Sequence, residues 1–175
     1  MTDSPEPDDI TRAHRAQPSA EEIAQVLAQR STATVGTLNP DGSIHLAYVA
    51  FLYQDGRFYF DTASVTRKAR NARKRPRASV LVQGRATTGR HLMVCAEGSA
   101  RILRGAEATA VNHRVRGKYA KPDLLPGLNL VWDSLDDIAV EITPATWRSW
   151  TSAPLREITS DALGVTYRDI WLPEE

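Results

Sequence analysis

Alternating apolar and polar positions along the first half of the chain predict a series of β-strands. Residues 32–38 are rich in β-branched side chains, residues 44–53 form a second apolar run, and residues 58–62 alternate aromatic and polar positions. The segments between them, 39–42 and 54–57, contain the Pro, Asp and Gly residues of tight turns. We therefore expect three successive strands joined as an antiparallel meander.

Three other stretches carry helix signals. Ser19 and Glu22 have the spacing of a capping box, in which each side chain bonds the backbone of the other residue. Thr66 can cap a helix start, and Pro76 ends that helix because proline biases the residue before it away from helical angles. The expected helices are residues 19–29, 66–75 and 107–119.

The second half of the chain adds strands separated by loops. Gly98 lies within a long apolar run and suggests a β-bulge, a bend of the kind that curls a sheet toward a barrel. No element is assigned to 154–175, where only Tyr167, Ile170 and Trp171 are candidates for docking. The expected strands are 78–82, 91–103, 137–143 and 146–151, and the expected loops are 83–89 and 120–130.

Together these elements predict a mainly β (α+β) fold. About six or seven strands and three helices occur without the alternating order that a parallel sheet requires, which favours an antiparallel β-barrel with flanking helices. We place this domain at residues 19–153, followed by a C-terminal extension at 154–175. Residues 1–18 are expected to be a disordered lead, because they have few apolar residues with which to offset the entropy of ordering.

Composition narrows the classes of function. The net charge is +1, and the single cysteine, Cys95, cannot form an internal disulfide, which fits a reducing cytoplasm. No apolar run approaches the ~20 residues of a membrane span, and the acidic N-terminus differs from a signal peptide. We therefore expect a cytoplasmic protein that binds neither membranes nor nucleic acid.

A dense group of cations follows the third predicted strand. No nearby acids compensate them at helical spacing, and the unpaired N–H groups of a helix start attract anions. The arrangement predicts a phosphate site, although a solvated basic helix remains the alternative interpretation. This cation row consists of Arg67, Lys68, Arg70, Arg73, Lys74, Arg75 and Arg77.

Other chemistries lack their motifs. The four histidines are scattered, there is no HExxH or CxxC motif, and we expect no metal site. The sequence also lacks GxSxG, P-loop and GxGxxG patterns. An antiparallel barrel with one basic anion site suggests a phosphate-bearing cofactor, which supplies chemistry that side chains cannot.

Residues 60–69, FDTASVTRKA, resemble the strand, turn and helix with which the pyridoxamine 5′-phosphate oxidase-like split β-barrel superfamily holds a flavin phosphate. The continuation through 76–82, PRASVLV, is most similar to the actinobacterial branch of F420-dependent or FMN-dependent oxidoreductases. The resemblance extends over about residues 20–150. It implies a homodimer with the cofactor in a groove between subunits.

The resemblance also implies roles for individual residues. Thr62, Thr66, Arg67 and Lys68 would bind the cofactor phosphate, and we call these four residues the phosphate seat. Asn71 would add a hydrogen bond. His45, Tyr48 and Ala50 lie on the strand that runs beside the cofactor ring in this family, and His45 and Tyr48 are the candidate proton donors.

Departures from the family pattern argue against vitamin B6 oxidation. Leu46 and Phe51 stand where pyridoxamine phosphate oxidases have an arginine and a lysine, Met93 stands near a family glutamine, and the C-terminal Arg-x-His motif is missing. The cation row could complement an anionic tail longer than one phosphate, such as the oligoglutamyl chain of F420. The sequence thus favours F420 slightly over FMN.

The resulting hypothesis is a flavin or deazaflavin oxidoreductase that transfers hydride to a small conjugated substrate. The alternative is a split-barrel protein that binds flavin or haem without turnover, with His91 or His113 as an axial ligand. An RNA-binding or nucleotide-binding barrel ranks last, because the cation row lacks interleaved aromatic residues for stacking.

Overall fold

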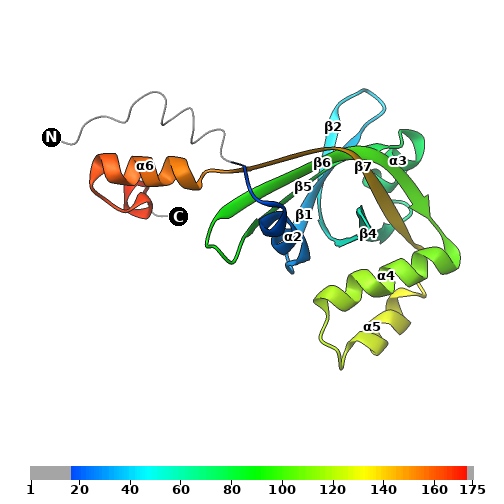
Figure 1. Cartoon of the computed structure of the whole chain (residues 1–175). Helices are drawn as coiled ribbons and strands as arrows, with labels where there is room; N and C mark the ends of the chain where they lie inside the picture. Colours follow the sequence, from blue (N-terminus) through cyan, green and yellow to red (C-terminus); the bar gives the residue numbers. More distant parts are fainter. Residues whose placement is uncertain (1–16, 173–175) are drawn as a thin grey trace.

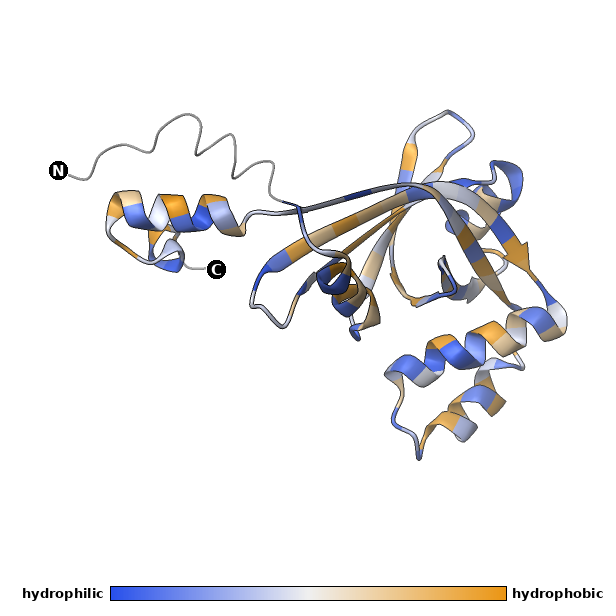
Figure 2. Ribbon diagram, in the orientation of Figure 1, coloured by the Kyte–Doolittle hydropathy of each residue, from blue (hydrophilic) through white to orange (hydrophobic). Residues whose placement is uncertain are grey.

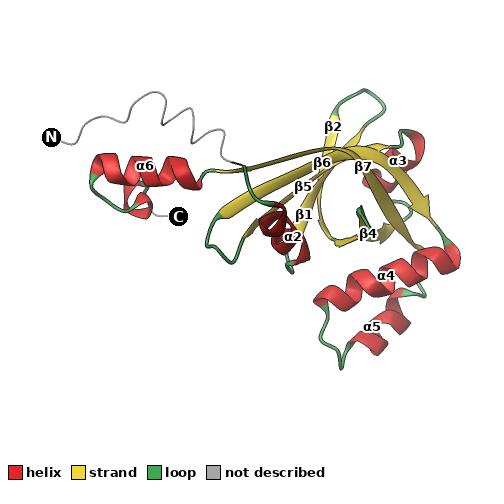
Figure 3. Ribbon diagram, viewed as in Figure 1, coloured by secondary structure: helices red, strands yellow, loops and turns green. Residues whose placement is uncertain are grey.

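The computed structural model describes residues 17–172 and contains one curled antiparallel sheet (Figure 1). Seven strands have the order β2-β1-β5-β6-β7-β4-β3. The strands are β1 (Thr32–Leu38), β2 (Ile44–Ala50), β3 (Leu52–Gln54), β4 (Arg57–Ala63), β5 (Arg77–Arg85), β6 (His91–Leu103) and β7 (Asp137–Thr151). The expected split β-barrel is confirmed, with helices around it (Figure 3).

The chain closes the barrel by crossing from one edge of the sheet to the other at Phe51. This residue separates β2, at one edge, from β3, at the opposite edge, and its side chain is 1% exposed. The predicted β1–β2 and β3–β4 hairpins are confirmed. The prediction that all three strands form one meander is wrong, because β2 pairs with β1 and β4 pairs with β3 and β7. The single apolar run at 44–53 is two strands, because β2 ends at one edge of the sheet and β3 begins at the opposite edge.

Two short helices close the ends of the barrel. Helix α2 (Ala20–Ala28) and helix α3 (Arg67–Lys74) both contribute apolar residues to the main core. The predicted capping box of α2 is confirmed, with the Ser19 backbone N–H 2.9 Å from the Glu22 carboxylate and the Glu22 N–H 3.2 Å from the Ser19 hydroxyl. Helix α3 begins after Thr66, as predicted.

A helical hairpin covers the outer side of β4 and β7. Helix α4 (Gly105–Tyr119) packs Val111 and Val115 against Tyr59 and Ala139 in a second core cluster, and the predicted helix is confirmed. The prediction of a loop at 120–130 is wrong, because helix α5 (Leu125–Trp132) begins within this segment. Its proline lies in the first turn, where the missing N–H costs nothing.

Strand β7 is continuous, whereas the sequence predicted two strands at 137–143 and 146–151. The pairing of β6 with β7 shifts register between Glu97 and Gly98, which confirms an irregularity at the predicted position, and the extra residue, Ala145, lies on β7. A Cβ atom at position 98 would lie 1.9 Å from the backbone oxygen of Thr143, so the two backbones approach too closely for any side chain. The loop expected at 83–89 is shorter than predicted, because β5 continues to Arg85.

The C-terminal extension contains helix α6 (Ala153–Leu163) and the 3-10 helix η1 (Tyr167–Ile170), which the sequence analysis did not assign. Gly164 ends α6 with a left-handed φ of 65°. The Tyr167 ring packs against Trp171 inside the extension, which lies apart from the barrel and mixes apolar and polar residues (Figures 1 and 2). No helix within 17–172 has the length and apolar character to cross a membrane. The predicted lead falls almost wholly outside the described residues.

Candidate functional site

The candidate site begins where β4 passes into α3. Thr66 caps the helix, its hydroxyl accepting a hydrogen bond from the Ala69 N–H at 3.4 Å. The Thr62 hydroxyl, from the end of β4, lies 3.1 Å from that of Thr66. The structure thus brings two hydroxyl groups together beside the N–H groups of a helix start, a combination suited to an anion.

Lys68 lies in the first turn of α3 and is half-buried. Burial lowers the pKa of its ammonium group, and the negative charge of Asp61 raises it. No carboxylate in the described part of the chain forms an ion pair with Lys68. A partly desolvated ammonium group without a paired carboxylate is available to an anionic ligand.

Arg67, the neighbour of Lys68, is exposed and faces a different side of the helix, because successive helical residues are about 100° apart. It lines a cleft of about 420 Å³ between α3 and the β1–β2 turn. The lining residues are Asn39, Pro40, Asp41, Ser43, Arg67, Arg70, Asn71 and Lys74. The structure therefore divides the phosphate seat, placing Arg67 in this cationic cleft while Lys68 lies toward Asp61.

Asn71 connects α3 to the first hairpin. Its side-chain Nδ2 donates to the Thr37 hydroxyl at 3.2 Å and to the Asn39 side-chain oxygen at 3.0 Å. The side chain is buried, so these bonds fix the orientation of the helix. The expected bond from Asn71 to a phosphate stays a prediction, and the observed contacts give the amide a role in holding α3 in place.

The structure separates His45 and Tyr48. His45 pairs with the buried Thr37 and lies on the inner side of β2 with Val49, whereas Tyr48 is 78% exposed on the outer side. Ala50, at the end of β2, packs against the second core cluster beneath α4. The two candidate proton donors therefore do not converge on one point.

The outer face of the sheet around Tyr48 is apolar. Ile44 and Leu46 are exposed there, and a cleft of about 370 Å³ extends from β2 across β1 and β5 to β6. Cys95 lies in this cleft, where burial raises the pKa of its thiol. The described helices contact the ends of the barrel and its β4 and β7 side, and they leave this face open.

Sequence reasoning missed two charged residues behind the site. Asp61 directly precedes Thr62 on β4, and Arg116 on α4 contacts its carboxylate at 3.4 Å. The sequence shows Asp61 as a polar residue before Thr62. Its pairing with Arg116 joins residues 55 positions apart, so no local pattern in the sequence could predict it.

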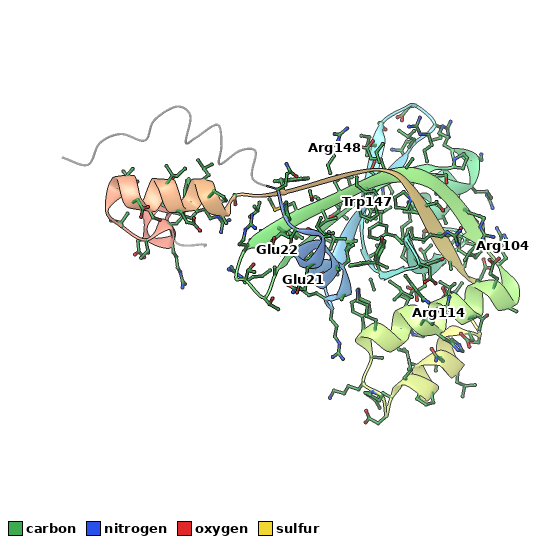
Figure 4. The ribbon with its side chains drawn as sticks, viewed as in Figure 1. Glu21, Glu22, Arg104, Arg114, Trp147 and Arg148 are labelled. Atoms are coloured by element: carbon green, nitrogen blue, oxygen red, sulfur yellow. The ribbon has the colours of Figure 1, made fainter. Side chains whose placement is uncertain are left out.

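A larger cavity of about 630 Å³ lies at the other end of the barrel. Residues of α2 and β7, including Trp147, line it together with Tyr53 and Val94. Trp147 and its neighbour Arg148 project to opposite sides of β7 (Figure 4). None of the predicted site residues lines this cavity.

The histidines of the haem alternative lie on different elements. The His113 ring Nε2 on α4 lies 2.6 Å from the Asp133 carboxylate. The pKa of His91, at the start of β6, is lowered by burial and then by the charges of Arg156 and Arg85. Within residues 17–172, no three His, Cys, Asp or Glu side chains form a group that could hold a metal ion.

Comparison with known structures places this geometry in the class of split β-barrel proteins. Conserved hypothetical protein Rv2991 from Mycobacterium tuberculosis is 27% identical, with a TM-score of 0.65 over 79% of this chain and 88% of that protein. An F420 reductase is 17% identical, with a TM-score of 0.55 over 75% and 98%. The haem storage protein HutZ from Vibrio cholerae is 15% identical, with a TM-score of 0.58 over 75% and 93%.

The sequence profile of the family described as pyridoxamine 5′-phosphate oxidase matches residues 19–151, which is most of the chain and includes both barrel-closing helices. The chain therefore belongs to the pyridoxamine 5′-phosphate oxidase family. The comparison with curated proteins gave no match.

Proposed function

We propose that this protein is a flavin- or deazaflavin-dependent oxidoreductase, with F420 favoured over FMN. The observation that carries the proposal is the half-buried ammonium group of Lys68, which has no paired carboxylate in the described chain and lies at a helix start beside Thr62 and Thr66. The family membership and the F420 reductase among its structural relatives support the choice of cofactor.

The residues present fit a cofactor phosphate. Backbone N–H groups at the start of α3, two adjacent hydroxyl groups and an ammonium group are all donors that a phosphate accepts. Thr62, Thr66 and Lys68 would hold the phosphate, and Arg67 would contribute from the side of the cationic cleft. The phosphate would give the partly desolvated ammonium group of Lys68 a negatively charged partner.

The cationic cleft supports F420 over FMN. The residues that line the cleft include three cations, Arg67, Arg70 and Lys74. Asp41 is the single acidic residue among them. The pKa of Asp41 is lowered, mainly by hydrogen bonds from Ser43, so this carboxylate already has its own donors. The cations remain available to the carboxylates of an oligoglutamyl tail.

The proposal includes a homodimer. The outer face of β2 exposes Ile44, Leu46 and Tyr48 beside the apolar cleft, and a second copy of the chain would cover these residues. The cofactor ring would then lie in the groove between subunits, close to Tyr48. Exposed aromatic and aliphatic residues on a sheet face are typical of such interfaces.

In the reaction, the cofactor supplies hydride transfer to or from a small conjugated substrate. The protein residues bind and orient: α3 and Lys68 fix the phosphate end, and β2 forms the wall for the ring. Tyr48 is the candidate proton donor on the outer face. His45, on the inner face, is the candidate that the geometry favours less.

The test is a titration of the purified protein with FMN and with F420, followed by cofactor fluorescence. Lys68→Ala should weaken binding of the favoured cofactor about 10- to 100-fold, because a charge-assisted hydrogen bond contributes about 1.5–3 kcal/mol. Arg73→Ala is the matched control, since Arg73 is an exposed cation on the same helix that does not line the cationic cleft. Equal affinity of the wild type and Lys68→Ala would contradict the proposal.

The same titration separates the two cofactors. The double variant Arg70→Ala and Lys74→Ala should weaken F420 binding and leave FMN affinity unchanged, because only F420 has a tail that reaches the cleft. The loss should shrink at high salt, where exposed charges are screened. An equal loss for both cofactors would contradict the assignment of the cleft to the tail.

A further inference from the structure

A buried arginine lies behind the phosphate seat. The Arg116 side chain is 2% exposed and extends from α4 into a group of carboxylates. Its guanidinium contacts Asp61 at 3.4 Å, Asp133 at 2.8 Å and Asp137 at 3.0 Å. One cation thus holds three carboxylates that come from β4, from the end of α5 and from the start of β7.

The helical hairpin fixes the position of this arginine. The Trp132 ring on α5 lies 5.1 Å from the guanidinium carbon, and the Asn129 side-chain oxygen accepts a hydrogen bond at 3.5 Å. Asp133 is itself bound by His113 at 2.6 Å. These contacts hold the Arg116 guanidinium in place beside Asp61.

Asp61 acts on the phosphate seat as well as on Arg116. Burial raises the pKa of its carboxyl group, and the charge of Arg116 opposes that rise. The same carboxylate raises the pKa of Lys68. Asp61 is therefore in contact with Arg116, and its negative charge also favours the charged form of Lys68.

We propose that Arg116 is a positioning residue for the phosphate seat, which holds the Asp61 carboxylate on the α4 side of β4 and so leaves the Lys68 ammonium group free for an anionic ligand. Without Arg116, Asp61 would be free to pair with Lys68, and the paired ammonium group would no longer be available to a phosphate. The inference rests on the proposed function, since it assigns the seat to an anion.

The test is a double-mutant cycle read by FMN titration, with inorganic phosphate as competitor. Arg116→Lys retains one charge for Asp133 and Asp137 but cannot reach three carboxylates, so it should fold and release Asp61. FMN affinity should fall about tenfold, as for loss of one charged contact. Asp61→Asn alone should bind FMN at least as tightly as the wild type.

The decisive result is rescue. Asp61→Asn combined with Arg116→Lys should restore the affinity of Asp61→Asn to within about threefold, because the competing carboxylate is gone. A merely structural arginine would give no rescue, since Asp133 and Asp137 would be equally disturbed. Absence of rescue overturns the inference. Arg114→Ala, at an exposed position of α4, is the control and should bind like the wild type.

A second readout does not depend on the cofactor. The pKa of Lys68, followed by NMR of labelled lysine side chains, should rise in Arg116→Lys and fall in Asp61→Asn relative to the wild type. A Lys68 pKa that is unchanged in Arg116→Lys overturns the inference even if FMN binds. The predicted shifts without any FMN or F420 binding would support the hold of Arg116 on Asp61 and refute the proposed function.

Discussion

Tyr119→Phe tests how the two edges of the sheet are held together. The Tyr119 hydroxyl, at the end of α4, accepts a hydrogen bond from the Phe51 N–H at 3.0 Å. It also lies 2.9 Å from the Phe51 carbonyl oxygen and 2.7 Å from that of Ser31, and its single proton serves one of them at a time. The phenylalanine variant keeps the ring and removes these contacts at the crossing point of the barrel.

The expected loss of stability follows from the backbone groups that the substitution leaves without a hydrogen-bond partner. Phe51 is buried, so its N–H loses its partner without gaining water, at a cost of about 1–3 kcal/mol. The lost bond to a carbonyl adds about 1 kcal/mol. We expect the free energy of unfolding to fall by about 2–4 kcal/mol, which is a large share of the stability of a typical domain.

Urea unfolding followed by tryptophan fluorescence measures this change. The midpoint should fall by about 1–2 M, since the slope for small proteins is about 1–3 kcal/mol per molar urea. Tyr48→Phe is the matched control: it removes the same atom from a side chain that is 78% exposed, and the midpoint should not move. A loss below about 0.5 kcal/mol, or equal losses in both variants, would refute the assigned role of Tyr119.

Two further predictions concern the bulge and a half-buried amine. Gly98→Ala should lower the free energy of unfolding by about 3 kcal/mol or more, because the new Cβ would meet the Thr143 backbone; an unchanged melting temperature would argue against the bulge geometry. Burial lowers the pKa of Lys118 from 10.5 to about 8, so the unfolded chain binds more protons between these values. The stability of the wild type should therefore rise with pH across this range relative to Lys118→Met, and parallel urea midpoints of the two proteins would contradict the shift.

Local signals in the sequence predicted local features of the fold well. The capping box at Ser19 and the helix start at Thr66 depend on side chains within three residues of the bonds they make. Gly98 marked the bulge because no other residue tolerates such a close approach. Strand positions followed from alternation, the order of the elements favoured an antiparallel barrel, and the family resemblance implied a split barrel.

The features that sequence reasoning missed depend on contacts between distant residues. The break at Phe51 is held by Tyr119, 68 positions away. Helix α5 contains Pro and Gly, which read as a loop, and it is stabilised by contacts such as the bond from Arg116 to Asp133. Propensity carries no information on such partners.

The candidate site was predicted in part. The strand, turn and helix around Lys68 have the expected form, and no observation yet tests the binding roles of these residues. The separation of His45 from Tyr48 was available from the sequence, because residues three apart on a strand point to opposite faces. The pairing of Asp61 with Arg116 was not available, since it depends on how α4 packs across the sheet.

The central claim is that the start of α3 binds the phosphate of a redox cofactor. A crystal structure of the protein grown with FMN or F420 tests it most directly, through the distance between the Lys68 Nζ atom and the nearest phosphate oxygen. We expect a distance of about 2.7–3.2 Å, with the Thr62 and Thr66 hydroxyl groups also in contact. A cofactor bound elsewhere, for example in the cavity beside α2, with Lys68 remote from its phosphate, would contradict it.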